Sequence, residues 1–509
     1  MNTTKRMKNT SLNVSSNLLL YIVSSILSFI VRTVFIRKLS VDLLGLDGVL
    51  LNIVTMLSIV ESGFSSAICF KLYKPLAEND TKKISSYMSF YKKIYSCIGI
   101  IILGLGILLS FFLNKIVNNY SYKYLYTVYF IYIFNVVFWY FVSYKEVLLF
   151  ADQKGYKVFK FNLVFKILTY LFQFLAITIF RNYIIYVICY VLCLSVNRII
   201  NNIYIAKNYE KVDFNSKEKL DQNDVNDIKQ NVFNIFFFKI GDYALNCTDG
   251  IIISALINLV VVGLYTNYMS ITAMLKSIIK KIFDGVTSSF GDLSVTNNVE
   301  AEKNVFDIMI FICFFITGYI TLCLLNSFNI FIEIWLGEKF VLEFSTVILI
   351  CLNFYLMCNQ IPLDTVKEAK GFYSKDKYYP VILAVLNIIL SIILGKVFGL
   401  NGIVGATSIS YILTITWNKP YVLYKYIFKD NVFKYYKDKI IYFISFVFIF
   451  FITNCLIKYI KIDSKIITFI LINVLNTIIY VIITTIFFFR KKEYQFIVNS
   501  LKNVMKRKY

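Results

Sequence analysis

The sequence predicts an all-α integral membrane protein with about 14 transmembrane helices. Of its 509 residues, 58% are hydrophobic and only 16% are charged, whereas soluble domains are about 45–50% apolar and about 25% charged. Several stretches contain no Asp, Glu, Lys or Arg over about 20 residues, which is enough for a helix to span the hydrocarbon core. These stretches are 9–31, 94–114, 124–144, 250–275, 308–332, 344–363, 397–418 and 466–489.

The predicted helices follow one another through short connections. We expect the first to stay as a helix rather than be cleaved as a signal peptide, because its apolar part is too long and no A-x-A-type site follows it. Lys166, Arg181 and Arg198 interrupt the apolar pattern of the fifth and sixth helices, and Pro362 inside the tenth predicts a kink. In order, the helices cover 12–37, 43–72, 84–113, 121–149, 156–180, 183–206, 228–257, 262–290, 304–327, 342–369, 378–398, 401–427, 438–458 and 466–489.

Basic residues predict the orientation of these helices. With the N-terminus inside, alternate loops place about 36 Lys and Arg on the cytoplasmic side and about 10 on the outer side, a bias typical of cytoplasmic loops. Both termini, including the basic tail 490–509, are therefore expected to be cytoplasmic. The net charge of +23 fits this bias. The sequence has no soluble segment in which basic and aromatic residues alternate, so we do not expect it to bind nucleic acid.

The polar stretch 207–229 divides two segments that look like copies. When the chain is shifted by 218 residues, nine of the 45 positions from 13 to 57 are identical, among them Gly45 with Gly263. Two copies of a helical unit that run in the same direction through the membrane are a recurring feature of transporter folds. We expect an N-terminal lobe (1–206), a solvated cytoplasmic linker (207–229), a C-terminal lobe (230–430), and two extra helices with a basic tail (431–509).

Composition also narrows the chemistry. The chain has no His, which removes the usual general base and the commonest metal ligand. Its 10 Cys lie in apolar stretches and form no CxxC pair, so they are expected to be small hydrophobic residues. We predict no catalytic residues, no metal and no cofactor.

Ionisable residues inside membrane helices are costly and usually face a cavity, so they are the candidates for a substrate site. Under the 218-residue shift, Arg32 falls on Gly250 beside Asp249, which places opposite charges at similar depth in the two lobes. Mid-helix amides such as Asn267 suit sugar hydroxyls. The predicted cavity residues are Arg32, Glu61, Lys166, Lys239, Asp242, Asp249, Asn267, Lys276 and Lys280.

A structural role for the same residues stays open. Lys239 and Asp242 have the i,i+3 spacing of an ion pair on one helix face, and buried amides also join helices by hydrogen bonds. The acidic residues Glu333, Glu338 and Glu343 surround one outer loop, where a solvated surface is the simplest interpretation.

Several segments resemble the oligosaccharide repeat-unit flippases (Wzx type) of the polysaccharide transporter family, in the multidrug/oligosaccharidyl-lipid/polysaccharide exporter superfamily. The resemblance covers roughly 10–410 and is little more than hydropathy in the last two helices. It rests on the run 45–95, which begins GLDGVLLNIVTMLSIVESGFSS, on KIGDYALNCTDGIIIS (239–254), VGLYTNYMSI (262–271) and FIEIWLGEKF (331–340), and on the run 353–410, which begins NFYLMCNQIPLDTVKEAKGFYSKDKYYP.

The resemblance implies a V-shaped, two-lobed transporter that works by alternating access in the bacterial cytoplasmic membrane. The implied cargo is an undecaprenyl-diphosphate-linked oligosaccharide, flipped from the inner to the outer leaflet for capsule, O-antigen-like or other surface polysaccharide. Implied partners are membrane lipids, a polysaccharide polymerase and chain-length machinery. No GxxxxGK[ST] motif for ATP occurs, so a proton or sodium gradient, or consumption of product outside, would supply the energy.

Two alternatives compete with the flippase interpretation. The first is a membrane-embedded polysaccharide polymerase or ligase, which would need catalytic acids and bases in an outer loop, whereas these loops are short and lack His. The second is a cation-coupled multidrug exporter of the same superfamily, which would suit an acidic, aromatic cavity better than one containing Arg32, Lys276 and Lys280.

Overall fold

The computed structural model describes residues 3–61, 63–117, 122–295, 298–370, 372, 375–460 and 462–506. Over these ranges every regular element is a helix. Packing divides the chain into unit 1, Met1–Gly263, and unit 2, Leu264–Tyr509, and each is described by itself below.

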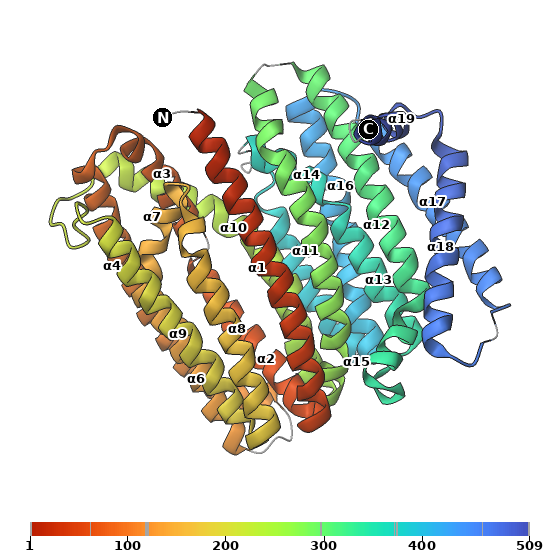
Figure 1. The fold of residues 1–509 in the computed structure, drawn as a ribbon, viewed down its shortest axis with the longest axis horizontal. Coiled ribbons are helices and arrows are strands. Elements are labelled where there is room, and N and C mark those ends of the chain that lie inside the picture. Colours follow the sequence, from red (N-terminus) through yellow and green to blue (C-terminus); the bar gives the residue numbers. More distant parts are fainter. Residues whose placement is uncertain are drawn as a thin grey trace. The chain divides into compact units, whose positions relative to one another are not determined.

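Unit 1 is a bundle of long helices, drawn in red to yellow in Figure 1. Successive long helices run in opposite directions, and short 3-10 turns join several of them. In order, the elements are α1 (Thr3–Lys38), α2 (Val41–Leu57), η1 (Ser58–Glu61), α3 (Phe64–Glu78), α4 (Thr81–Ser110), α5 (Leu113–Ile116), α6 (Tyr122–Val142), η2 (Ser143–Lys145), α7 (Glu146–Ala151), η3 (Gly155–Val158), α8 (Phe159–Leu175), η4 (Ala176–Phe180), α9 (Tyr183–Asn208) and α10 (Gln222–Leu256).

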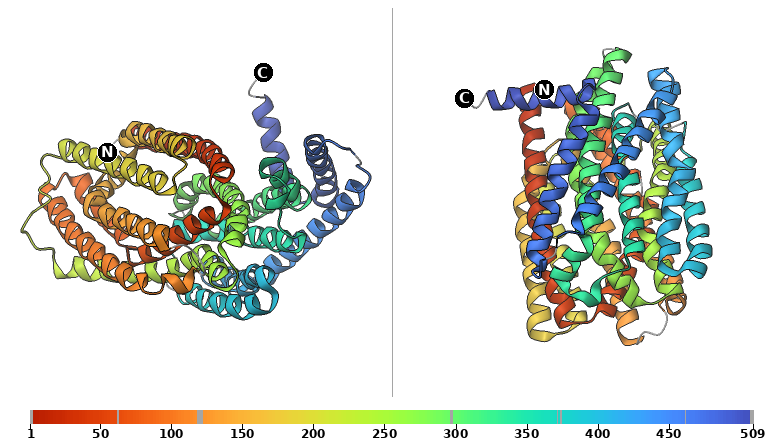
Figure 2. Two further views of the ribbon diagram at one scale, coloured as in Figure 1. Left: turned by 90° about the horizontal axis from the view of Figure 1, so that it is seen from below. Right: turned by 90° about the vertical axis from the view of Figure 1, so that its right-hand side faces the viewer.

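Unit 2 is a second helical bundle, drawn in green to blue, and α11 enters it from unit 1. Its last helix, α19, lies across the other helices of the unit rather than along them (Figure 2). The elements are α11 (Leu259–Val295), α12 (Val299–Leu336), η5 (Glu338–Phe340), α13 (Phe344–Cys358), α14 (Ile361–Lys370), α15 (Tyr379–Leu413), α16 (Ile415–Leu423), η6 (Tyr424–Phe428), α17 (Phe433–Ile457), α18 (Lys465–Phe488) and α19 (Lys492–Lys506).

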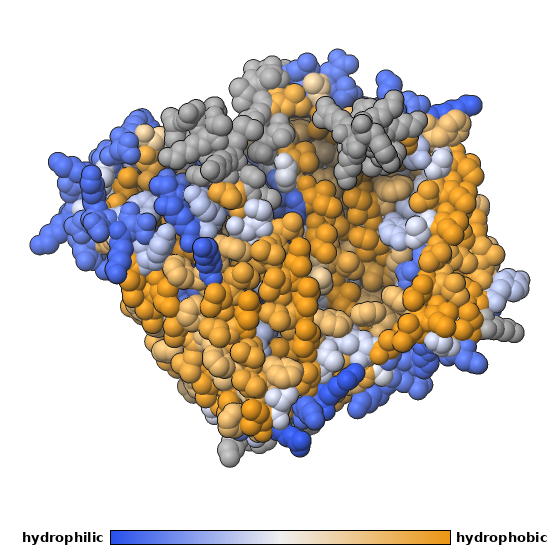
Figure 3. Space-filling model, viewed as in Figure 1, coloured by the Kyte–Doolittle hydropathy of each residue, from blue (hydrophilic) through white to orange (hydrophobic). Residues whose placement is uncertain are grey.

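The helices confirm the predicted fold class, an all-α multi-pass membrane protein. Within the described ranges, 11 helices are long and apolar enough to cross a membrane. One of them, Tyr379–Phe428, has 50 residues and turns back at Gly399, whose φ of 57° favours glycine. All 14 predicted segments fall on helices, including α10 and α11. Apolar residues dominate the sides of the helices, and polar residues gather at their ends (Figure 3).

Several of the predicted helices are interrupted, among them 121–149 at η2 and 401–427 between α15 and α16. The segment predicted as a continuous helix over 43–72 is divided into α2, η1 and α3, and this prediction of continuity is wrong. Gly63 lies between η1 and α3 with a φ of 102°, a conformation that a side chain would strain. The interruption predicted around Pro362 is confirmed, because α13 ends at Cys358 and α14 begins at Ile361.

Two sets of contacts recur at the 218-residue spacing of the proposed repeat. A β-carbon on Gly45 would stand 2.0 Å from the Leu259 carbonyl oxygen, and one on Gly263 would stand 2.5 Å from the Val41 carbonyl oxygen. Positions 41 and 45 differ from 259 and 263 by 218. The two segments therefore approach each other reciprocally, as copies related by a two-fold axis would. The predicted lobe boundaries stay a prediction.

The second recurring contact joins an acidic residue to a later helix. Asn201 on α9 donates a hydrogen bond to Glu146, the first residue of α7. Lys419 on α16 forms an ion pair with Asp364 of α14, with Nζ and Oδ1 2.6 Å apart. Positions 146 and 201 shifted by 218 give 364 and 419, so each half of the chain ties an acidic residue after a helix break to the same position of a later helix.

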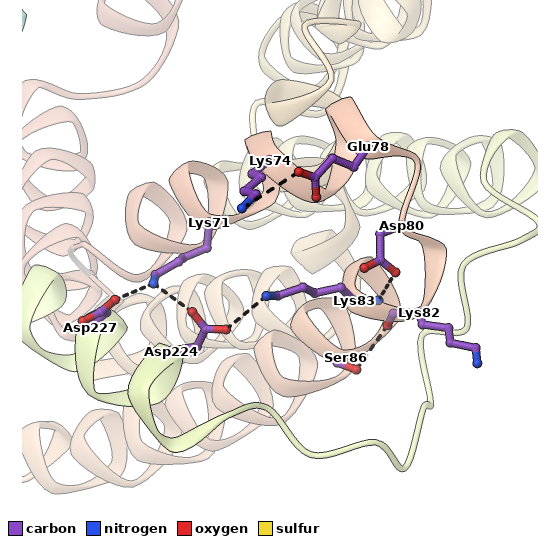
Figure 4. Close-up of polar contacts among 9 residues, drawn as sticks. All are labelled: Lys71, Lys74, Glu78, Asp80, Lys82, Lys83, Ser86, Asp224 and Asp227. Carbon is purple, nitrogen blue, oxygen red and sulfur yellow. Dashed lines mark hydrogen bonds and ion pairs between the residues drawn. The ribbon is translucent and has the colours of Figure 1, made fainter.

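The predicted linker is partly docked in unit 1. The Ser89 hydroxyl on α4 donates to the Ser216 carbonyl oxygen at 2.7 Å, and Lys92 Nζ donates to Asn215 Oδ1 at 2.6 Å. At the start of α10, Lys71 pairs with Asp224 at 3.0 Å and with Asp227 at 2.7 Å (Figure 4). These bonds fasten the stretch between α9 and α10 to α3 and α4.

Candidate functional site

A buried polar cluster in unit 1 centres on Asp47 of α2. Its Oδ1 atom accepts hydrogen bonds from the hydroxyls of Tyr132 on α6, at 2.5 Å, and Tyr183 on α9, at 2.9 Å. Arg32 of α1 interacts electrostatically with Asp47 and with Tyr186. Four helices thus bring a carboxylate, a guanidinium and three phenols together, and the opposite charges offset part of the cost of burial.

Aromatic packing orients this cluster. Phe35, three residues after Arg32, packs edge-on against Tyr183 and Tyr186, with ring centroids 6.0 and 5.1 Å apart. Lys166 is linked to the same group, since its Nζ lies 5.2 Å from the ring centroid of Tyr170, which interacts electrostatically with Tyr186. The structure therefore connects two of the predicted cavity cations, Arg32 and Lys166, through tyrosines.

Asp47 is a polar residue that the sequence analysis did not select. It follows the start of a predicted helix closely, and an acidic residue in such a place is usually explained by the helix dipole. The available signal was the spacing of Tyr183, Tyr186 and Tyr190, which share one face of a helix.

Glu61 and Lys239 are brought together at the interruption between α2 and α3. The Tyr95 hydroxyl donates to Glu61 Oε1 at 2.7 Å, and Lys239 of α10 interacts electrostatically with Glu61. The rings of Tyr91 and Tyr95 lie 4.2 Å apart. Gly63, two residues after Glu61, packs against the backbone of α10, so the interruption places Glu61 close to that helix.

The other predicted residues of α10 lie nearer its end. Asp249 is buried, and the amide of Asn52 on α2 lies against Gly250, where a β-carbon would stand 2.5 Å from Nδ2. The side chain of Asp242 lies outside the described residues. Asn267, on α11 in unit 2, is fully buried.

In unit 2, Lys276 and Lys280 on α11 differ in their surroundings. Lys276 is half-buried, and its Nζ lies 3.8 Å from the Met357 sulfur. Lys280 is exposed. A thioether is a weak acceptor, so the Met357 contact satisfies little of the hydrogen-bonding capacity of the Lys276 ammonium.

A second half-buried lysine, Lys439 on α17, was missed by the sequence analysis. Its Nζ donates to Asn359 Oδ1 at 2.7 Å, and Asn359 follows α13 directly. In the sequence, Lys439 belongs to the basic run FKYYKDK at a helix start. Such a run fits a cytoplasmic helix end by the positive-inside rule, and no local pattern distinguishes this lysine from its neighbours.

Five other buried or half-buried lysines of unit 2 are paired with acidic side chains. Over the described residues, neither Lys276 nor Lys439 has a carboxylate within 4.0 Å. The paired lysines are Lys303 with Asp430, Lys367 with Asp376 (2.5 Å), Lys370 with Glu302 (2.6 Å), Lys419 with Asp364 (2.6 Å) and Lys491 with Asp438 (2.8 Å).

Unit 2 also has an apolar groove of about 320 Å³ formed by α11, α12 and α18. Aliphatic and aromatic side chains make up most of its lining, with a few polar groups such as Ser327 and Asn473. The apolar lining includes Ile271, Leu275, Leu324, Phe328, Phe331 and Phe469. Such a groove fits a hydrocarbon chain.

The described side chains offer no group of three or more His, Cys, Asp or Glu placed to hold a metal ion. The sites above present cations, phenols, amides and carboxylates. These groups bind anions and hydroxyl-rich molecules by charge-assisted and neutral hydrogen bonds.

The sequence has a match among protein families. Residues 11–287 match the family described as "Polysaccharide biosynthesis protein", which covers more than half of the 509 residues. A search of curated proteins finds no match.

Solved structures with the same fold are membrane transporters. The lipid II flippase MurJ in an inward closed conformation has 16% identity and a TM-score of 0.68, over 92% of this chain and 98% of MurJ. An inward-facing multidrug resistance MATE family transporter of the MOP superfamily has 12% identity and a TM-score of 0.60, over 80% and 97%. The Vibrio cholerae MATE transporter VcmN in its bent form has 11% identity and a TM-score of 0.55, over 83% and 98%.

Proposed function

The chain belongs to the polysaccharide biosynthesis protein family, and from that premise we propose that it flips undecaprenyl-diphosphate-linked oligosaccharide repeat units from the inner to the outer leaflet. The product would serve capsule, O-antigen-like or other surface polysaccharide synthesis. MurJ, which shares the fold, is by name a flippase of lipid II. That this chain also carries a lipid-linked cargo is part of our proposal.

The observation that carries the proposal is the uncompensated charge of Lys276. A half-buried ammonium inside a membrane protein, with a thioether 3.8 Å away and no carboxylate within 4.0 Å over the described residues, is costly. A diphosphate headgroup supplies the missing anion through charge-assisted hydrogen bonds. Arg32 in unit 1 offers a planar, always charged guanidinium for the same purpose.

The apolar groove of unit 2 supports a lipid cargo over a free sugar phosphate. A polyprenyl chain is hydrocarbon, and the groove lining of Leu324, Phe328, Phe331 and neighbouring residues would replace lipid around part of it. Tyrosine hydroxyls and amides such as Asn52 would hydrogen-bond the glycan. In this proposal the side chains bind and orient the cargo, and no bond is made or broken.

The cellular setting is proposed on the same basis. The protein would lie in a bacterial cytoplasmic membrane with both termini and the 207–229 stretch inside, as the distribution of basic residues predicts. A proton or sodium gradient, or removal of product by a polymerase and chain-length machinery outside, would drive net movement.

A deletion strain tests this function against its two competitors. We expect undecaprenyl-diphosphate-linked repeat units to accumulate in the inner leaflet, surface polymer to be lost, and plasmid-borne protein to restore it. Unchanged drug-resistance profiles are expected, since a multidrug exporter would alter them. Repeat units that reach the outer leaflet but are not polymerised would instead favour the polymerase or ligase interpretation.

A further inference from the structure

The C-terminal helix α19 has one apolar side and one polar side. Apolar residues three or four positions apart share one face of a helix. On α19 this spacing is kept by Tyr494, Ile497, Val498, Leu501, Val504 and Met505. Phe496 is the one apolar residue of 494–505 outside this face, and the polar residues Lys492, Gln495 and Asn499 are exposed. The pattern is typical of a helix that lies along an apolar surface.

Two contacts turn the apolar face toward the membrane-spanning part of unit 2. The hydroxyls of Tyr494 and of Thr485 on α18 are joined by a hydrogen bond of 2.7 Å. The Tyr494 ring also lies edge-on to Phe311 of α12, with centroids 6.3 Å apart. Both partners belong to helices that are long and apolar enough to cross a membrane. The face that contains Tyr494 is therefore directed toward the membrane interior.

Lys491 fixes the bend between α18 and α19. Its Nζ donates to Asp438 Oδ1 at 2.8 Å and to the Tyr442 hydroxyl at 3.0 Å, and both of these residues lie on α17. The same ammonium lies 4.6 Å from the ring centroid of Tyr442. The start of α19 is thus held, and the helix runs across the other helices of unit 2 (Figure 2). Because those helices cross the membrane, α19 lies along the membrane surface.

The second part of α19 extends past the other helices of unit 2 (Figure 2). The helix has 15 residues, which gives a length of ~22 Å at about 1.5 Å per residue. Its apolar spacing continues to Met505, into the part that extends beyond the bundle. There the face that begins against α12 and α18 would meet the acyl region of the bilayer instead of protein.

Basic residues select the kind of lipid. Over 490–509, seven residues are Lys or Arg and one is acidic. By their spacing, Lys492, Lys502 and Lys506 fall on the polar side of α19. Lysines on the polar side of an amphipathic helix lie at the level of the headgroups and attract anionic lipids.

We infer that α19 is an interfacial helix that binds anionic phospholipids of the adjacent leaflet. Its apolar face enters the edge of the acyl region, and its lysines contact the negatively charged headgroups. The inference goes beyond the proposed function, because it concerns the lipid that surrounds the protein and not the cargo that the protein moves.

Hydrogen exchange of the full-length protein in nanodiscs tests the lipid preference. We expect the amides of 495–506 to exchange about tenfold or more slowly in phosphatidylglycerol than in phosphatidylcholine, because each lysine near an anionic surface adds to binding. The Lys502→Gln, Lys506→Gln double variant should lose most of this difference. The matched control is Lys434→Gln, Lys437→Gln, which removes the same charge from exposed positions of α17 and should keep the difference.

A second measurement tests which face of α19 meets the lipid. In a variant whose native cysteines are replaced by serine, a spin label at Leu501→Cys should be accessible to oxygen and shielded from a water-soluble nickel complex. A label at Asn503→Cys, on the polar side by its spacing, should show the reverse. Equal access of the nickel complex to both labels in phosphatidylglycerol would place α19 in water and overturn the inference.

A protein contact would give a different result. Exchange over 495–506 that is equally slow in both lipids, and unchanged in the Lys502→Gln, Lys506→Gln variant, would mean that this chain or a second copy holds the helix. That outcome would also overturn the inference. Neither measurement depends on the cargo, so both can be made on a protein whose transport activity is still untested.

Discussion

Arg32 and Asp47 show how the polar interior of unit 1 is arranged at the scale of single residues. Asp47 accepts two tyrosine hydroxyls and interacts with Arg32. The opposite charge of Asp47 offsets part of the cost of burying the Arg32 guanidinium.

We predict that Arg32→Ala lowers cargo transport about tenfold or more, because it removes a charged hydrogen-bond donor. Arg32→Lys should recover part of the activity if charge is what matters, and less if bidentate geometry matters. Export of surface polymer at matched membrane abundance is the measurement. Arg37→Ala, an exposed residue on the same helix, should transport like the wild type. Equal loss in both variants would argue against a specific role for Arg32.

Residue roles were only partly predictable from the sequence. Charge inside an apolar run singled out Arg32, Glu61 and Lys276, because a membrane makes such residues costly. Asp47 and Lys439 escaped because each lies close to a helix start, where charges are ordinary. Their roles depend on side chains from helices distant in the chain, such as Tyr183 for Asp47 and Asn359 for Lys439.

At the scale of helices, Gly45 and Gly263 set how closely two segments approach. We predict that Gly45→Ala and Gly263→Ala each destabilise the protein by about 1–3 kcal/mol, because their β-carbons would stand 2.0 and 2.5 Å from carbonyl oxygens. Gly104→Ala has open space within 4 Å and should be neutral or slightly stabilising, since alanine favours a helix. Thermal unfolding in detergent measures the difference, and equal melting of all three variants would contradict the close approach.

The docked stretch between α9 and α10 gives a second prediction at this scale. Asp224→Asn should speed amide hydrogen exchange over 209–221, because it weakens the ion pair with Lys71 that fastens the start of α10 (Figure 4). Lys74→Gln is the control, since its pair with Glu78 is exposed and 3.9 Å long, and such pairs contribute little. Exchange that is as slow in Asp224→Asn as in the control would show that this pair does not hold the stretch.

Acid should release the same contact. Burial alone would raise the pKa of the Asp224 carboxyl, but hydrogen bonds from Lys71 and Tyr87 and the charges of Lys71 and Lys83 outweigh it and lower that pKa. The contact therefore stabilises the docked state above the ordinary pKa of an aspartate and is lost as the pH falls through the lowered value. Exchange over 209–221 should speed up in that acidic range and be independent of pH above it once intrinsic exchange is corrected.

Helix positions were easier to predict than helix continuity. Hydropathy located all 14 segments, because apolar length is what a membrane requires. Pro362 marked one break, since proline has no N–H to donate. The break before α3 had no such mark, because Gly63 is tolerated inside helices and its φ of 102° arises from packing against α10.

For the whole molecule, orientation is the prediction that labelling tests. Cysteines at Asn215 and Ser500, in a variant whose native cysteines are replaced by serine, should resist a membrane-impermeant thiol reagent in intact cells. A cysteine at the exposed Asp463, in the loop between α17 and α18 that we predict to lie outside, should react. Labelling of position 215 or 500 in sealed cells would reverse the proposed orientation, because basic loops would then lie outside.

One test addresses the central claim directly. The claim is that the protein moves a lipid-linked diphosphate sugar between leaflets and that cationic side chains inside its helical units bind the diphosphate. Purified protein in liposomes is given an undecaprenyl-diphosphate-linked oligosaccharide, and the appearance of the sugar at the opposite leaflet is followed with a membrane-impermeant lectin. We predict translocation by the wild-type protein and its loss in the Arg32→Ala, Lys276→Ala double variant at equal reconstitution. Translocation by the double variant at the wild-type rate, or no translocation by the wild-type protein, would contradict the claim.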